Sequence, residues 1–223
     1  MTLKLFVEAI IKFTFGVVLI GALIFLPAGT FAYAGGWLLM GILFIPMFGA
    51  GLVMMAKDPS LLASRLDAKE KEKTQSIVVK LSGLMFIVGF VLAGLDFRFG
   101  WIKLPFAVNI VAAVVFIIAY LLYAEVLREN TYLSRTIEVQ EGQKVIDTGL
   151  YGIVRHPMYS ATLLLFLSMP IVLGSAPAFL IFLAYPFIIA ARLKDEEKLL
   201  EEELEGYCEY KKKVKYRLIP FVW

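Results

Sequence analysis

Ionisable side chains that could bind or act on a ligand gather in two short stretches of the sequence. The first reads Arg-His-Pro-Met-Tyr over 155–159, and the second reads Arg-Leu-Lys-Asp-Glu-Glu over 192–197. An imidazole exchanges protons near neutral pH, guanidinium groups bind anions, and carboxylates accept hydrogen bonds from ammonium groups and hydroxyls. If the fold brings the two stretches together, they can bind a ligand that carries both signs of charge.

The composition places these stretches in a membrane protein. Only 18% of the 223 residues are charged and 60% are hydrophobic, against about 25% charged residues in an ordinary soluble domain. The mean hydropathy of +0.80 excludes a soluble globular protein. Since a bilayer crossing needs about 20 apolar residues, the sequence predicts four membrane helices at Leu5–Leu26, Gly35–Ala56, Ile77–Leu95 and Pro105–Leu127.

A fifth apolar stretch, 158–191, separates the two ionisable stretches. It is too long for one crossing and is interrupted by Leu-Gly-Ser-Ala-Pro at 173–177, so it predicts a helical hairpin. Proline is favoured in the first turn of a helix, so Pro157 is expected to start the first arm, with His156 at its cap. Because a hairpin returns the chain to its starting side, 155–159 and 192–197 are expected to be neighbours.

The predicted fold class is therefore an all-α integral membrane protein with about six membrane helices, the last two forming the hairpin. Residues 1–223 are predicted to form one domain: membrane helices over 1–127, a cytosolic polar connection over 128–157, the hairpin over 158–191 and a cytosolic tail over 192–223.

Both polar segments carry further local patterns. In the polar connection, alternating apolar residues around a Glu141–Gly142 turn suggest a short two-stranded ribbon over 137–146. In the tail, a helix is expected to continue from the hairpin to Gly206, followed by Tyr207, Tyr210 and Val214 at helical spacing.

The distribution of lysine and arginine predicts the orientation. They are abundant in the 57–73 loop, the polar connection and the tail, whereas only Arg98 and Lys103 fall in the loops on the other side. Positive residues remain on the cytoplasmic side, so a multi-pass protein with cytoplasmic N- and C-termini is expected. A cleaved signal over 1–34 is disfavoured, because its apolar run is longer than the usual 7–15 residues.

Several kinds of site are excluded or disfavoured. A single cysteine, Cys208, permits no disulfide within the chain or cysteine-based zinc site, and the single histidine, His156, excludes multi-histidine metal sites, so no metal is expected. With a net charge of only +3 and basic residues beside apolar segments, membrane lipids rather than nucleic acid are the expected partners.

Each polar feature alone has a simpler interpretation. An arginine or histidine at the membrane edge commonly anchors a helix, charges over 194–205 can be a solvated helix face, and Tyr207 and Tyr210 can be interface aromatics. The combination of opposite charges and a histidine beside a membrane-buried hairpin favours a ligand that is charged at one end and apolar at the other.

These residues carry a family resemblance. They are Gly149, Tyr151, Arg155, His156, Pro157 and Tyr159, then Arg192, Glu196, Glu197 and Leu200, then Tyr207, Tyr210, Val214, Arg217 and Pro220. With them the sequence resembles the isoprenylcysteine carboxyl methyltransferase family, which is related to the phospholipid N-methyltransferases. The resemblance covers the chain from Asp96 onward, and the first two helices match only as hydrophobic spans.

The resemblance implies S-adenosylmethionine as the methyl donor. The residues implied to line its site are Tyr151, Val154, Arg155, His156 and Tyr159 on one side and Glu196 and Glu197 on the other. The carboxylate, ammonium and hydroxyl groups of this cofactor match the cationic and acidic residues present. No Gly-x-Gly-x-x-Gly motif occurs. Glycine is common in the family directly after the tyrosine, whereas this chain has Ser160 and Ala161.

The first functional hypothesis is a membrane methyltransferase acting on a lipophilic or lipidated substrate that arrives from the bilayer between the fourth helix and the hairpin. A prenylcysteine-like carboxylate is the favoured acceptor, with Arg192 holding it; an amine or thiol would need a base, for which Glu196 or His156 is the candidate. The sequence does not distinguish methylation of oxygen, nitrogen or sulfur.

Two alternatives remain open. An NADPH-dependent membrane reductase of the sterol-reductase type would share the His-Pro-x-Tyr and Tyr-x-x-Tyr features, although the Glu-Glu pair favours the methyltransferase. A non-enzymatic binding protein or transporter is disfavoured, because the centres of the predicted spans lack ionisable residues.

Overall fold

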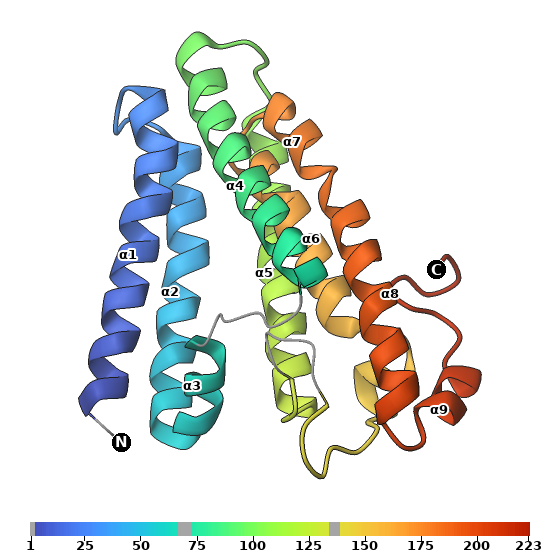
Figure 1. Ribbon diagram of the computed structural model, residues 1–223. Helices are drawn as coiled ribbons and strands as arrows, with labels where there is room; N and C mark the ends of the chain where they lie inside the picture. The colour runs from blue at the N-terminus through green and yellow to red at the C-terminus, as the bar shows by residue number, and fades with distance from the viewer. Residues whose placement is uncertain (1–2, 67–72, 134–138) are drawn as a thin grey trace.

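The computed structural model describes residues 3–66, 73–133 and 139–223, and these residues form helices and loops without strands (Figure 1). Five helical segments are long and apolar enough to cross a membrane: α1 (Leu3–Ala28), α2 (Ala34–Lys57), α4 (Lys73–Phe99), α5 (Phe106–Glu129) and the combined stretch Ala176–Glu203. The sixth apolar helix, α6 (Pro157–Val172), has 16 residues. The predicted all-α integral membrane fold is thus confirmed.

Close helix packing depends on glycine at two positions of α4. A Cβ atom on Gly94 would lie 2.5 Å from the backbone oxygen of Ile24 in α1, and one on Gly89 would lie 2.3 Å from the ring of Phe182. Small residues at such positions let membrane helices approach closely. The core that results is centred on the fully buried side chains Ile24, Leu39, Phe90, Phe116, Phe182 and Leu193.

The predicted hairpin turn lies where the sequence places it. After α6 the chain turns at Gly174, which has a φ of +78°, a conformation that glycine adopts without strain. Ser175 then caps α7 (Ala176–Phe182) by accepting a hydrogen bond from the N–H of Ala178 at 3.2 Å.

The second arm differs from the single helix predicted. It is divided at Leu183 and Ala184 into α7 and α8 (Tyr185–Glu203). Pro186 explains the division, because proline has no N–H to donate to Phe182, four residues earlier, and its ring crowds that carbonyl.

The short helix α3 (Pro59–Leu66) was not predicted. Asp58 caps its start by accepting a hydrogen bond from the N–H of Leu61 at 3.0 Å, and Pro59 occupies the first helical position. The Asp-Pro-Ser sequence was the local signal for it. At its other end, the carbonyl of Leu66 accepts a hydrogen bond from Lys12, which also pairs with Glu8 at 2.6 Å.

The two-stranded ribbon predicted over 137–146 is wrong for the part that the structure describes. Residues 139–146 contain a turn in which Gln143 N–H donates to the carbonyl of Gln140, with Gly142 at a φ of +71°, but no strand pairing. Ile137 lies outside the described residues. The turn was predicted correctly, but its flanks instead support the tail, where Val139 and Val145 pack against Leu204, Tyr207, Tyr210 and Val214.

The polar segments gather at one end of the bundle. Figure 1 shows the start of α1, α3, the polar connection, the end of α8 and α9 (Tyr207–Lys213) at the same end. Gly206, with a φ of +85°, makes the corner between α8 and α9. The described parts of these segments therefore gather at one end of the bundle, whereas the C-terminus lies farther along it, beside α8 (Figure 1).

Candidate functional site

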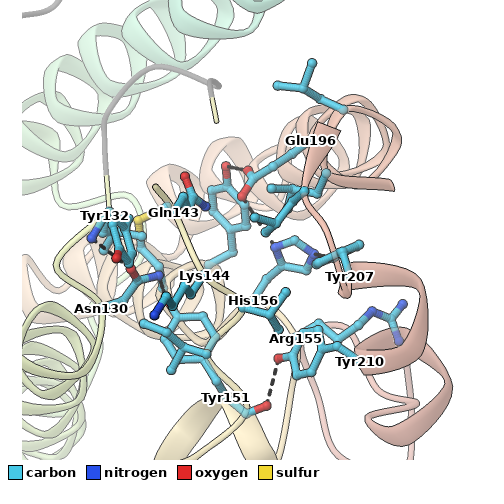
Figure 2. A pocket seen from close by; sticks show the side chains of 18 of the residues that line it. Asn130, Tyr132, Gln143, Lys144, Tyr151, Arg155, His156, Glu196, Tyr207 and Tyr210 are labelled. Carbon is cyan, nitrogen blue, oxygen red and sulfur yellow. Dashed lines mark hydrogen bonds and ion pairs between the residues drawn. The ribbon is translucent and has the colours of Figure 1, made fainter. Parts of the chain in front are cut away.

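A polar pocket lies at this end of the bundle, between the polar connection, the start of α6, α8 and α9 (Figure 2). It encloses about 830 Å³ of empty space, part of it open to solvent. Six of the predicted site residues line it: Tyr151, Arg155, His156, Tyr159, Arg192 and Glu196. Val154 and Glu197 are buried close by but are not among its lining residues.

The tail fixes the start of α6. The N–H groups of Arg155 and His156 donate to the carbonyls of Tyr216 and Arg217 at 2.9 and 3.0 Å, so the tail runs alongside the residues that precede the helix. Ser160 Oγ donates to the carbonyl of Leu218 at 2.6 Å. Ser160, directly after Tyr159, therefore helps to hold the tail against α6.

His156 lies between the two glutamates of α8. Its Nδ1 is 3.6 Å from Glu196 Oε1, its Nε2 is 3.4 Å from Glu197 Oε1, and the Tyr207 hydroxyl is also 3.4 Å from Nε2. Burial, with 5% of the residue exposed, lowers the pKa of His156, whereas hydrogen bonds with both glutamates and their negative charges raise it. The net shift of its pKa is upward from 6.5.

Glu197 is the centre of a buried ionic network. Only 2% of this residue is exposed, and its carboxylate accepts hydrogen bonds from Arg155 Nε at 2.7 Å and Arg217 Nε at 2.8 Å. Arg155 also donates from Nη1 to the carbonyls of Val214 and Lys215, both at 2.8 Å. This network joins the start of α6, α8 and the tail, and its Arg155 also lines the pocket.

Glu196 belongs to a second group that opens to the pocket. The Tyr159 hydroxyl donates a hydrogen bond to Glu196, and Arg192 Nε donates to that same hydroxyl at 3.0 Å. The Glu196 side chain remains 21% exposed, in contrast to Glu197. The adjacent glutamates therefore have different surroundings, and Glu196 is the one available to a ligand.

Tyr151 closes the pocket from the polar connection. It lies in the short 3-10 helix η1 (Gly149–Gly152), where its hydroxyl accepts a hydrogen bond from Asn130 at 2.9 Å and its carbonyl accepts one from Tyr210 at 2.7 Å. Burial raises the pKa of Tyr151 to about 12, so the phenol stays protonated. Gly149, with a φ of +54°, lies against the Glu129 carboxylate, where a Cβ atom would not fit.

Further lining residues were not placed in the site by the sequence. They are Asn130, Tyr132, Gln143 and Lys144 from the polar connection, and Tyr207 and Tyr210 from α9. Figure 2 shows Asn130, Tyr132 and Lys144 across the pocket from His156 and Tyr207. The polar character of these residues was the signal available in the sequence. Whether their side chains point into the pocket depends on contacts between distant segments. The assembled pocket presents an ammonium, a carboxylate and several phenols to one ligand.

The raised pKa of His156 predicts a pH-dependent stability. Since protonation is favoured in the folded state, the stabilisation is fully present below the unfolded value near 6.5 and is lost as the pH rises through the raised pKa. Every tenfold difference in proton affinity between the two states is worth about 1.4 kcal/mol. We expect the melting temperature of the detergent-solubilised protein to fall as the pH rises from about 6.5 through the raised pKa of His156.

His156→Gln is the matched variant, because glutamine cannot take up the proton. Its melting temperature should change less between about pH 6 and pH 9 than that of the unaltered protein. Parallel curves for the two proteins would show that His156 is not the group responsible.

Comparison with known proteins finds a family similarity in the segment that carries most of this site. Residues 106–205, from the start of α5 to just beyond α8, match the protein family described as phospholipid methyltransferase. The predicted family resemblance is confirmed. The segment that matches the phospholipid methyltransferase family includes all the predicted site residues from Tyr151 to Glu197, whereas Tyr207, Tyr210 and Arg217 follow it.

Two sterol reductases are also similar to the chain. Delta(14)-sterol reductase TM7SF2 of Mus musculus is 30% identical over 91 residues, which is 40% of this chain and 22% of the reductase. Delta(14)-sterol reductase of Arabidopsis thaliana is 26% identical over 170 residues, which is 67% of this chain and 46% of the reductase. The chain therefore spans less than half the length of each of these curated relatives.

Proposed function

We propose that the protein is an S-adenosylmethionine-dependent methyltransferase that acts on a lipophilic acceptor at the boundary between membrane and cytosol. The observation that carries this proposal is the pocket at the end of the segment that matches the phospholipid methyltransferase family, in which Glu196, His156, Arg192 and Tyr159 meet. A pocket at the membrane boundary with both signs of charge suits an ionic cofactor and an acceptor that is polar only at one end.

The residues present fit the cofactor. Glu196 would accept hydrogen bonds from its ammonium group or ribose hydroxyls, and Lys144, across the pocket, would donate to its carboxylate. The phenols of Tyr151 and Tyr207 offer aromatic surface and hydroxyl donors to the remaining parts. When bound, S-adenosylmethionine would supply an activated methyl group.

The acceptor would be positioned by Arg192. A carboxylate, such as that of a prenylcysteine, is already ionised near neutral pH and needs orientation and exclusion of water rather than a base. Arg192 lines the pocket and is the first charged residue of α8 after its apolar start. This position suits the task of holding the acceptor. For an amine acceptor, Glu196 or His156 would instead accept the proton.

The proposal also includes the orientation of the protein in the membrane. The concentration of lysine and arginine at the end of the bundle that carries the pocket supports a cytosolic pocket and cytoplasmic N- and C-termini. A cysteine-accessibility assay on intact cells, with single cysteines introduced at exposed Glu203 and Trp101 in a Cys208→Ser background, tests it. We expect only the cysteine at position 101 to react with an impermeant reagent from outside.

A second candidate function, an NADPH-dependent membrane reductase, is supported by the similarity to the two sterol reductases. It predicts binding of NADPH rather than S-adenosylmethionine. Isothermal titration calorimetry of the solubilised protein with S-adenosylmethionine, its demethylated product and NADPH separates the two functions. Saturable binding of NADPH with no heat from the other two compounds would reject the methyltransferase proposal.

Glu196→Ala is expected to weaken binding of S-adenosylmethionine by about 10- to 150-fold. This range corresponds to the loss of one charge-assisted hydrogen bond, about 1.5 to 3 kcal/mol. His156→Ala should weaken binding in the same direction, because the imidazole holds the Glu196 carboxylate in place. The measurement is the dissociation constant from calorimetry.

Glu203→Ala is the control, since it removes an exposed carboxylate of the same helix that does not line the pocket. It should bind the cofactor as the unaltered protein does. If Glu196→Ala and His156→Ala also bind it unchanged, the cofactor site lies elsewhere.

A further inference from the structure

An apolar loop over residues 219–223 follows the part of the tail that contacts the polar site. Its sequence is Ile-Pro-Phe-Val-Trp, without an ionisable side chain. Ile219, Phe221 and Val222 are 42%, 87% and 74% exposed, so the chain itself leaves much of this apolar surface uncovered. Large apolar side chains that are exposed together mark a contact surface for a partner or a membrane.

The backbone of the apolar loop is bonded within the loop itself. The N–H groups of residues 217–219 all donate to the carbonyl oxygen of Trp223, at 2.9, 3.0 and 3.1 Å. The N–H groups of Val222 and Trp223 donate to the carbonyl of Ile219, both at 3.1 Å. In hydrocarbon, backbone groups must find their partners within the protein, because no water is there to bond them. These five hydrogen bonds therefore suit the loop to an apolar surrounding.

The apolar loop lies beside helices of the membrane bundle. The Leu218 carbonyl, which directly precedes the loop, accepts a hydrogen bond at 2.6 Å from Ser160, in the first turn of α6. Figure 1 shows the chain running from α9 back along the bundle, so that its C-terminus lies beside α8 rather than level with α9. The start of α6 opens the apolar run 158–172, so the loop is level with the beginning of the apolar layer. Lipid acyl chains are the apolar groups that its exposed side chains meet there.

The apolar loop is also attached to the polar site. Arg217, just before it, donates from Nε to Glu197 at 2.8 Å, and its guanidinium carbon lies 5.4 Å from the centre of the Trp223 ring. The carbonyl of Arg217 accepts the N–H of His156 at 3.0 Å. Tryptophan rings are favoured at the boundary between hydrocarbon and head groups. Arg217 therefore joins the loop to the buried carboxylate that also binds Arg155.

We propose that the apolar loop 219–223 inserts into the adjacent leaflet of the bilayer, where acyl chains cover Ile219, Phe221 and Val222 and hold the tail against α6 and α8. The partner is the apolar layer of the membrane rather than a particular head group. The proposal does not depend on methyl transfer, because none of the residues 219–223 lines the polar pocket.

The test reads the surroundings of a nitroxide label on a single cysteine, in the whole chain reconstituted into phosphatidylcholine vesicles. Val222→Cys in a Cys208→Ser background places the label on the apolar loop, at an exposed side chain. Power saturation of the electron paramagnetic resonance signal measures collisions with oxygen, which concentrates in hydrocarbon, and with a water-soluble nickel chelate. The unaltered chain labelled at exposed Cys208 on α9 is the aqueous standard, and Leu180→Cys on α7, in the Cys208→Ser background, is the hydrocarbon standard.

We expect the label at position 222 to behave like the label at position 180. Its contact with the nickel chelate should be at least about tenfold lower than that of the label on Cys208, because a polar complex is excluded from hydrocarbon. Adding Phe221→Asp should raise this contact to the level of Cys208, since an ionised carboxylate is unstable among acyl chains. Phe221→Leu is the matched control, because leucine keeps the position apolar and should leave the contact low.

Nickel contact at position 222 equal to that at Cys208 would overturn the proposal. Low contact with both reagents would also overturn it, because the loop would then be covered by protein rather than lipid. Unchanged contact in the Phe221→Asp variant would contradict the role of the exposed apolar side chains. If Val222→Cys does not fold, Phe221→Cys carries the label and the same two standards decide. The measurement needs no cofactor, so calorimetry with S-adenosylmethionine tests the proposed function separately.

Discussion

Replacing Glu197 by alanine is expected to lower the free energy of unfolding by about 3–5 kcal/mol. Glu197 is 2% exposed and its carboxylate accepts hydrogen bonds from Arg155 and Arg217, so its removal leaves the buried Arg155 guanidinium without its ionic partner. The measurement is the unfolding midpoint and slope in mixed micelles of mild detergent and sodium dodecyl sulfate.

Two controls separate this effect from loss of the cofactor site. Glu196→Ala removes the neighbouring but more exposed carboxylate, so it should cost clearly less stability than Glu197→Ala. The double variant Arg155→Met with Glu197→Leu should lose less stability than Glu197→Ala, because no buried guanidinium is then left without its carboxylate, although the carbonyls of Val214 and Lys215 lose their donor. A loss below about 1 kcal/mol for Glu197→Ala would mean that the network does not hold the tail to α6 and α8.

The membrane helices and the hairpin could be predicted because their signals are local. The four apolar runs match α1, α2, α4 and α5, and the turn at 173–177 forms because Gly174 and Ser175 suit a positive φ and a helix cap. The neighbourhood of 155–159 and 192–197 followed from the hairpin alone. The structure shows it in the contacts of Arg155 with Glu197 and of Tyr159 with Glu196.

What the sequence could not show depends on contacts between distant segments. Glu196 and Glu197 are identical in type and adjacent, yet only the structure shows that Glu197 is enclosed by Arg155 and Arg217 while Glu196 lines the pocket. Lys144 and Gln143 face the pocket because the polar connection packs against α9. The same packing, in which Val145 contacts the tail, replaces the predicted ribbon.

The division between α7 and α8 had a local signal in the sequence that the prediction did not use. Pro186 lies within the apolar run, and hydropathy treats the run as continuous although proline ends the hydrogen-bonding pattern. The consequence is functional as well as structural. The direction of α8, which is set at this break, determines where Arg192 and Glu196 meet Tyr159.

The second prediction with a large effect concerns the path that the acceptor's apolar chain takes along the protein. An apolar groove runs between α5 and α6, lined by Val111, Val115, Leu164 and Leu167. Met158 of α6 lines the polar pocket, and Leu164, six residues later, lies about 9 Å further along the helix. An acceptor whose polar group is at Arg192 would therefore need a long chain to reach the groove.

We expect that shortening the alkyl or prenyl chain of an acceptor by five carbons raises its apparent Michaelis constant by at least tenfold. At about 0.8 kcal/mol per buried methylene, full burial of the five carbons would amount to about 4 kcal/mol, close to a thousandfold, and partial burial gives the lower bound. The measurement is transfer of labelled methyl groups to acceptors of graded chain length, corrected for their partition into detergent micelles.

Leu164→Trp, which narrows the groove, should reduce this dependence on chain length, whereas exposed Leu180→Trp on α7 should not. If short, water-soluble acceptors with the same polar group are methylated as efficiently as long ones after that correction, the acceptor does not arrive from the bilayer.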